Sequence, residues 1–88
     1  MKAHEWSKEK NEWLKKNRNI SFEEVLEAIE HNKILSQEKH FNRTKYPNQH
    51  MYIVEIDYYA YMIPYVETEE VIFLKTIIPS RKATKKYL

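Results

Sequence analysis

The 88-residue sequence contains no cysteine and no glycine. Without cysteine, the chain forms no disulfide, thiolate zinc site or cysteine nucleophile. Without glycine, it has none of the glycine-rich loops that bind phosphates or dinucleotides, and its turns must use Asn, Asp and Pro. An apolar run of about 18 residues and an apolar N-terminal region are absent as well. We therefore expect one domain over residues 1–88, without a membrane span and with a cytoplasmic location.

Charge is unevenly distributed along the chain. Residues 1–37 carry seven Lys/Arg and seven Glu, whereas residues 51–74 carry five acids and no Lys/Arg. Residues 75–88 carry five cations and no acid, and the cations are Lys75, Arg81, Lys82, Lys85 and Lys86. A basic end of this kind favours a polyanionic ligand. Pairing of the acidic and basic blocks across a sheet would explain the same pattern.

Two helices are expected in the first third of the chain. Ser7 is a candidate N-cap for a helix over residues 8–17, which follows a short strand at residues 3–6. Ser21 and Glu24 have the spacing of a capping box, which predicts a second helix over residues 22–30. The expected apolar contacts of the first helix are Trp6, Trp13, Leu14 and Ile20, and those of the second are Phe22, Val25, Leu26 and Ile29.

The remainder of the chain has the pattern of a strand meander. Strands are expected from residue 34 toward 40 and over residues 50–57, 59–66 and 71–78, with a turn-rich loop at 41–49. The short turns between the last three strands imply antiparallel pairing. Pro64 predicts a bulge or an unpaired position. The expected fold class is α+β, with two N-terminal helices packed on an antiparallel β-meander and a short basic C-terminal tail or helix.

Two motifs stand near the ends of the chain, and both are similar to patterns of one family. The first is Glu5-Trp6-Ser7-Lys8-Glu9-Lys10 followed by Ile20-Ser21-Phe22-Glu23-Glu24, and the second is Ile77-Ile78-Pro79-Ser80-Arg81-Lys82-Ala83-Thr84-Lys85-Lys86. They resemble E-W-D-x-x-K with G-[VI]-S-F-E-E, and I-I-S-A-R-K-A-[TS]-[RK]-[RK], in the BrnT-like toxins of bacterial type II toxin–antitoxin systems. These toxins belong to the RelE/ParE group. The chain departs from the family at His50-Met51, where relatives have Glu-Arg, and at Thr76, where relatives have a basic residue.

The resemblance implies a RelE-like fold and a toxin that inhibits translation as an endoribonuclease. RNA, cleaved free or on the ribosome, would be the substrate, and the chemistry would need no metal or other cofactor. A cognate antitoxin of the ribbon-helix-helix type would neutralise the toxin and would supply the only contact with operator DNA. The alternative is a non-catalytic RNA- or antitoxin-binding module with the same fold.

Specific residues can be assigned to such a cleavage reaction, in which a 2′-hydroxyl attacks the adjacent phosphate. Arg81 is the expected oxyanion clamp, because guanidinium binds phosphate in a bidentate manner. His50 and Glu67 are the candidate acid–base residues. The expected RNA-binding residues are Lys75, Lys82, Lys85, Lys86 and Tyr87.

Each of these residues also has a plainer interpretation. The cations would form a solvated tail, His50 a polar surface residue and Glu67 an acid in a hairpin turn, while Tyr87 would pack the tail on the sheet. The tyrosines of residues 52–65 could form a stacking platform for bases, but β-propensity and core packing explain them more simply. His40 and His50 are too widely separated to indicate a metal site.

Overall fold

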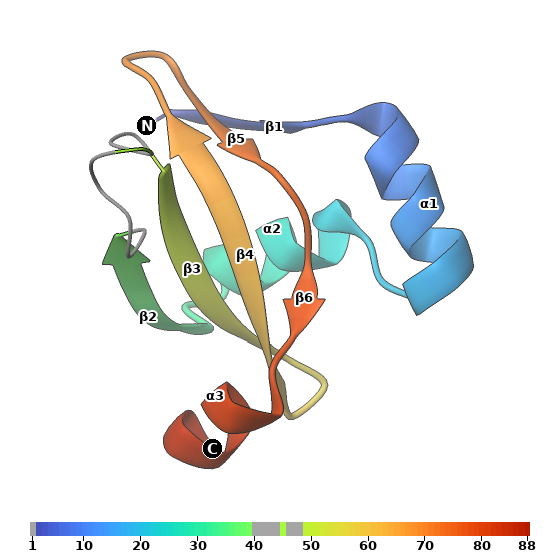
Figure 1. Cartoon of the computed structure of the whole chain (residues 1–88), viewed down its shortest axis with the longest axis vertical. Coiled ribbons are helices and arrows are strands. Elements are labelled where there is room, and N and C mark those ends of the chain that lie inside the picture. The colour runs from blue at the N-terminus through green and yellow to red at the C-terminus, as the bar shows by residue number, and fades with distance from the viewer. Residues whose placement is uncertain (1, 40–44, 46–48) are drawn as a thin grey trace.

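The part of the chain that the structure describes forms three helices and one six-stranded sheet (Figure 1). The structure is a computed structural model that describes residues 2–39, 45 and 49–88. The helices are α1 (Lys8–Arg18), α2 (Phe22–Glu30) and α3 (Arg81–Tyr87). The strands are β1 (Ala3–Trp6), β2 (Ile34–Lys39), β3 (Gln49–Ile56), β4 (Tyr59–Glu67), β5 (Val71–Leu74) and β6 (Ile78–Pro79). The α+β class is confirmed, and the basic end forms a helix.

The sheet is mixed, with the strand order β1-β5-β4-β3-β2 and with β6 paired to β4. Strands β2 to β5 form the expected antiparallel meander. The strand expected at residues 3–6 had no predicted direction, and as β1 it runs parallel to β5, with Ala3 opposite Val71, so the whole sheet is mixed. No short turn constrains the direction of β1, since two helices and three strands separate it from β5 along the chain. Its Trp6 stacks on Phe22 of α2, with the ring centroids 5.6 Å apart.

The strand predicted over residues 71–78 is interrupted opposite Pro64. Strand β5 pairs with the end of β4, and β6 pairs with Tyr61 and Met62. Pro64 accepts a hydrogen bond from the Lys75 N–H at 2.8 Å but has no N–H to return. Since the N–H and C=O of a strand residue point to the same side, the missing donor of Pro64 lies at this break. Of the two alternatives predicted from Pro64, a bulge or an unpaired position, the unpaired position is the one seen, on the side of β4 that faces β5 and β6.

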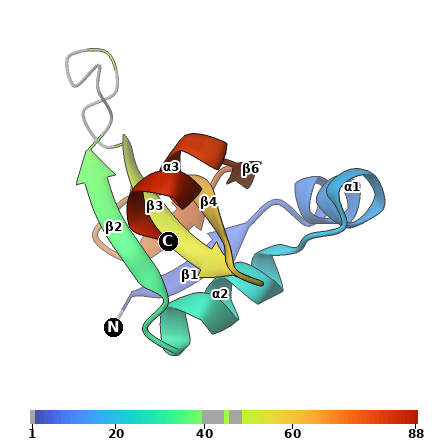
Figure 2. The same ribbon diagram turned by 90° about the horizontal axis from the view of Figure 1, so that it is seen from below.

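Helices cover both faces of the sheet (Figure 2). On one face, α1 and α2 pack against the main core, which includes Leu14, Phe22, Val25, Tyr52, Val54, Ile63, Tyr65, Leu74 and Ile77. On the other face, α3 packs against a smaller cluster of Ile53, Ala60 and Ala83, with Leu35, Met62 and Tyr87 beside it. Successive residues of β3 and β4 alternate between these two faces.

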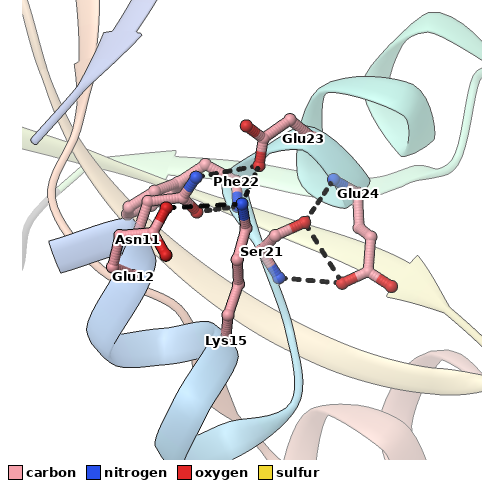
Figure 3. Close-up of polar contacts among 7 residues, drawn as sticks. All are labelled: Asn11, Glu12, Lys15, Ser21, Phe22, Glu23 and Glu24. Carbon is pink, nitrogen blue, oxygen red and sulfur yellow. Dashed lines mark hydrogen bonds and ion pairs between the residues drawn. The ribbon is translucent and has the colours of Figure 1, made fainter. Parts of the chain in front are cut away.

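The junction of α1 and α2 is held by polar contacts (Figure 3). The buried Asn11 accepts a hydrogen bond from the Phe22 N–H and donates one to Glu23 Oε1, both at 2.8 Å. Ser21 Oγ accepts from the Glu24 N–H, and the Glu24 carboxylate accepts from the Ser21 N–H. The predicted capping box is confirmed, and it fixes where α2 begins.

Asn and Asp occupy most of the turn positions that need a positive φ. The residues with positive φ are Asn19, Asn32, Asp57 and Tyr58.

The predicted loop at 41–49, like His40, lies largely outside the described residues. Within those residues, no helix has the length and apolar character needed to cross a membrane.

Candidate functional site

Helix α3 is fastened to the central strand by its first turn. The Ser80 N–H donates to the Ala60 carbonyl at 3.0 Å. The Thr84 hydroxyl donates to the Ser80 carbonyl at 2.8 Å and accepts from the Ala60 N–H at 2.9 Å. Ser80 Oγ caps the helix by accepting from the Ala83 N–H. The basic end of the chain is therefore held in one orientation on the sheet.

The cations of α3 are exposed to solvent. Ala83 is buried and Tyr87 half-buried against the sheet, whereas Arg81, Lys82, Lys85 and Lys86 are exposed. Among the residues that the structure describes, the ion pairs join Lys2 to Glu67 and Lys15 to Glu12 and Glu23, so none involves α3. The acidic and basic blocks of the sequence are thus not paired at this helix, and α3 presents four uncompensated positive charges.

A groove of about 270 Å³ runs beside α3 over β2, β3 and β4. Its apolar lining comes from Met51, Ile53, Met62 and Ala83, and its polar lining comes from Ser80, Lys82, Lys86, Glu38 and Tyr87. The Tyr87 hydroxyl donates to Glu38 Oε2 at 3.4 Å, and the Ser36 hydroxyl donates to the same oxygen at 3.2 Å. The groove therefore combines two lysines with one carboxylate held by two hydroxyls.

Sequence reasoning missed Glu38. The cross-strand register places Glu38 opposite Met51, and therefore on the sheet face that α3 covers. The alternation of β3 identifies the face of Met51 from the sequence, but the sequence does not reveal which face α3 covers. Lys75 is an expected RNA-binding residue that does not line the groove. Its N–H bonds to Pro64 on the β5 side of β4, whereas the groove extends over β3 and β2.

His50 and Glu67 lie on the opposite face of the sheet from α3, and Glu67 lies at the far end of β4. Together with Lys2, Thr68 and Glu69 they line a shallow hollow of about 450 Å³. Lys2 forms an ion pair with Glu67, and the hydrogen bond from its ammonium group holds the pKa of the Glu67 carboxyl below its ordinary value. The His50 ring stacks on Tyr65, with the centroids 5.4 Å apart.

The structure does not bring Arg81 together with His50 and Glu67. Ser80, which precedes Arg81, bonds to Ala60 at the start of β4, whereas Glu67 ends the same strand. Seven residues of extended chain separate these positions by roughly 23 Å. Glu67 is therefore distant from the basic end along β4 (Figure 1). His50 is separated in a different way: its neighbour Met51 lines the groove, but the His50 ring stacks on Tyr65 on the other face of the sheet.

The tyrosines of β3 and β4 are buried (Tyr52 and Tyr65) or half-buried (Tyr59 and Tyr61). Tyr52 and Tyr65 are buried and stack with their centroids 4.3 Å apart. Burial, together with a smaller contribution from nearby Tyr65, raises the pKa of Tyr52 to about 12. Gln37 donates to the Tyr65 hydroxyl at 2.7 Å. Core packing, the simpler explanation of these two tyrosines, is therefore correct, and neither ring is available to stack on a base.

Among the described residues, no cluster of three or more His, Asp or Glu could hold a metal ion. In comparisons with known proteins, no family model, curated protein or solved structure matches the chain. Its function must therefore be inferred from its own residues and their geometry.

Proposed function

We propose that this chain is the toxin of a type II toxin–antitoxin pair and that it acts on RNA through α3. The observation that carries the proposal is the fixed cationic surface of this helix. Arg81 and Lys85 are one helical turn apart, as are Lys82 and Lys86, so the four side chains form two parallel rows. An RNA backbone that lies along the helix can contact both rows, and each contact releases counterions.

The resemblance to BrnT-like toxins supports the toxin assignment. Within the C-terminal motif, Ile77 and Ala83 are buried, and Ser80 and Thr84 fasten α3 to β4. The four cations of the motif, by contrast, are exposed. The motif therefore combines residues that fix α3 to the sheet with four cations that remain exposed. By the same resemblance, the partner is a ribbon-helix-helix antitoxin that covers this surface and neutralises the toxin.

Two forms of the proposal differ in their chemistry. In the first, the protein cleaves RNA and so inhibits translation, as the family resemblance implies. In the second, it binds RNA or the antitoxin without cleavage. Arg81 is separated from His50 and Glu67. If these three are the only catalytic residues, this separation favours the second form, which is binding without cleavage.

RNA binding is tested by fluorescence anisotropy with a labelled single-stranded RNA of 20 nucleotides at several salt concentrations. We expect the double variant Lys82→Ala/Lys86→Ala to reduce the slope of log K against log[salt] by about 1.4, since each phosphate contact on a single strand contributes about 0.7. The matched control, Lys8→Ala/Lys16→Ala, removes two exposed lysines of α1 and should leave the slope unchanged. Equal effects of the two variants would overturn the assignment of α3.

The two forms are separated by cleavage and growth assays. Purified protein is incubated with mRNA, alone and in a translation extract, beside Arg81→Ala. Cleavage by the wild type that Arg81→Ala abolishes supports the nuclease. Growth arrest on expression without RNA cleavage, and unaffected by Arg81→Ala, supports the binding module.

A further inference from the structure

The groove beside α3 contains the acid–base group that the cationic helix otherwise lacks. We propose that Glu38 is the general base of an RNA-cleaving centre formed by Glu38, Lys82 and Lys86, a role that the sequence assigned to His50 or Glu67. This inference rests on the proposed action on RNA, and it identifies the residue that would perform the chemistry.

The position of Glu38 suits a base that must meet its substrate in a fixed orientation. Two hydroxyl groups, from Ser36 and Tyr87, donate to its Oε2. Both bonds go to Oε2, and Glu38 lines the groove, so within the described residues Oε1 is not engaged by either hydroxyl. Tyr87 comes from α3 and Glu38 from β2, so their contact joins the basic helix to the carboxylate.

The charges of the groove are arranged for a phosphate between them. Lys82 and Lys86 line the groove together with Glu38, but neither lysine forms an ion pair with this carboxylate. The apolar side chains of Met51, Ile53 and Met62 lie in the same lining. A phosphodiester can therefore contact the ammonium groups while the adjacent ribose 2′-hydroxyl faces Glu38. Ammonium groups at this place stabilise the charge that develops on the phosphoryl oxygens.

The reaction balances without a metal or a redox partner. The Glu38 carboxylate takes the proton of the 2′-hydroxyl, and the 2′-oxygen forms a bond to phosphorus. The bond from phosphorus to the 5′-oxygen breaks, and this oxygen takes a proton from the ammonium group of Lys82 or Lys86. The products are a 2′,3′-cyclic phosphate and a 5′-hydroxyl. Transfer of a proton from the Glu38 carboxyl to the neutral lysine, through solvent, restores the starting state.

Glu67 provides the matched control. It is also a glutamate at a strand end, but Lys2 is bonded to its carboxylate, and it lies on the face away from α3. The experiment compares wild type, Glu38→Gln and Glu67→Gln on one labelled single-stranded RNA of 20 nucleotides. Binding is measured by anisotropy, and cleavage by single-turnover kinetics with analysis of the product ends.

We expect Glu38→Gln to bind RNA as tightly as the wild type, within about twofold, and to cleave it about 10²–10⁴-fold more slowly, the usual contribution of a general base. Glu67→Gln should cleave at the wild-type rate. A 2′-deoxy substitution at the cleaved position should block the reaction, and the product should end in a 2′,3′-cyclic phosphate.

Three results would overturn the inference. They are wild-type cleavage that Glu38→Gln does not slow, a larger loss in Glu67→Gln, and RNA binding by the wild type without any cleavage. RNA binding is measured separately from cleavage, so these results do not by themselves contradict it. Failure of the wild type to bind RNA would instead contradict the proposed function, so the two failures are distinguishable.

Discussion

At the scale of single residues, Thr84 connects α3 to the sheet. Its hydroxyl accepts from the Ala60 N–H and donates to the Ser80 carbonyl, and the residue is half-buried. Replacement by the nearly isosteric valine leaves the Ala60 N–H without a partner. Because an unsatisfied buried donor costs about 1–3 kcal/mol, we expect Thr84→Val to lower the free energy of unfolding by this amount.

Urea denaturation followed by circular dichroism measures this loss. The control is Thr84→Ser, which keeps the hydroxyl and should retain most of the stability. A valine variant as stable as the wild type would show that the hydrogen bond to Ala60 does not hold α3 in place.

Glu23 makes the stability of the α1–α2 junction depend on pH. The hydrogen bond from the Asn11 amide is the main cause that lowers the pKa of Glu23, and backbone hydrogen bonding at the same residue adds to it. A lowered pKa in the folded state means that the contribution to stability is complete above the unfolded-state pKa. This contribution is lost as the pH falls through the folded-state pKa.

An NMR titration of the side-chain carboxyl carbons tests this prediction. We expect the pKa of Glu23 to rise toward its ordinary value in Asn11→Ala. The control Lys15→Met removes the ion-pair partner of Glu23, a smaller cause of the lowered pKa, and should raise it less. A larger rise in Lys15→Met would show that charge, rather than the amide hydrogen bond, controls the carboxyl.

The burial of individual side chains was predicted least well from the sequence. Trp13 was expected to pack against the core but is 44% exposed. Its ring instead contacts the Lys10 ammonium group and the Arg18 guanidinium group, at 4.5 and 5.1 Å from the centroid. Asn11 and Leu14 occupy the buried face of α1. A pattern of apolar residues cannot identify a polar residue such as Asn11 as buried, because its burial depends on partners in α2.

At the scale of secondary-structure elements, the β3–β4 turn contains a steric cost. Asp57 and Tyr58 have φ values of 52° and 63°. Both central residues of such a two-residue hairpin turn need positive φ, and glycine is the favoured second residue. Tyr58 is 88% exposed, so little packing would be lost by its removal. We expect Tyr58→Gly to stabilise the protein by about 0.5–1 kcal/mol, the left-handed cost of a side chain less the entropy cost of glycine.

Thermal unfolding measures this gain. Tyr58→Ala keeps the Cβ atom and therefore the steric cost, so it should not raise the melting temperature. Stabilisation by alanine equal to that by glycine would contradict the explanation from backbone conformation.

Elements with local signals were predicted well from the sequence. The caps at Ser7 and Ser21 give the starts of α1 and α2, and Asn19 ends α1 in the left-handed conformation. The strand predicted over residues 71–78 is divided into β5 and β6, whereas the sequence predicted only a local irregularity at Pro64. The parallel pairing of β1 with β5 was missed, since it joins segments far apart in the sequence and no turn between them specifies a direction.

At the scale of the whole molecule, the candidate residues occupy two places on opposite faces of the sheet. The cations of α3 lie with Glu38 on one face, whereas His50 and Glu67 lie on the other. The charge pattern and the motif identified the cations from the sequence alone. The grouping of residues into a site could not be predicted, because it depends on the face to which α3 returns after β6.

Mapping of RNA contacts by NMR tests the central claim most directly. Amide chemical shifts of the ¹⁵N-labelled protein are followed as a single-stranded RNA of 20 nucleotides is added at low salt. We predict that the shifts change along α3 and at Glu38 and Met51, and that those of Lys2 and Glu67 remain constant. Changes confined to Lys2, His50 and Glu67, or no changes at all, would contradict the assignment of the α3 groove as the RNA-binding surface.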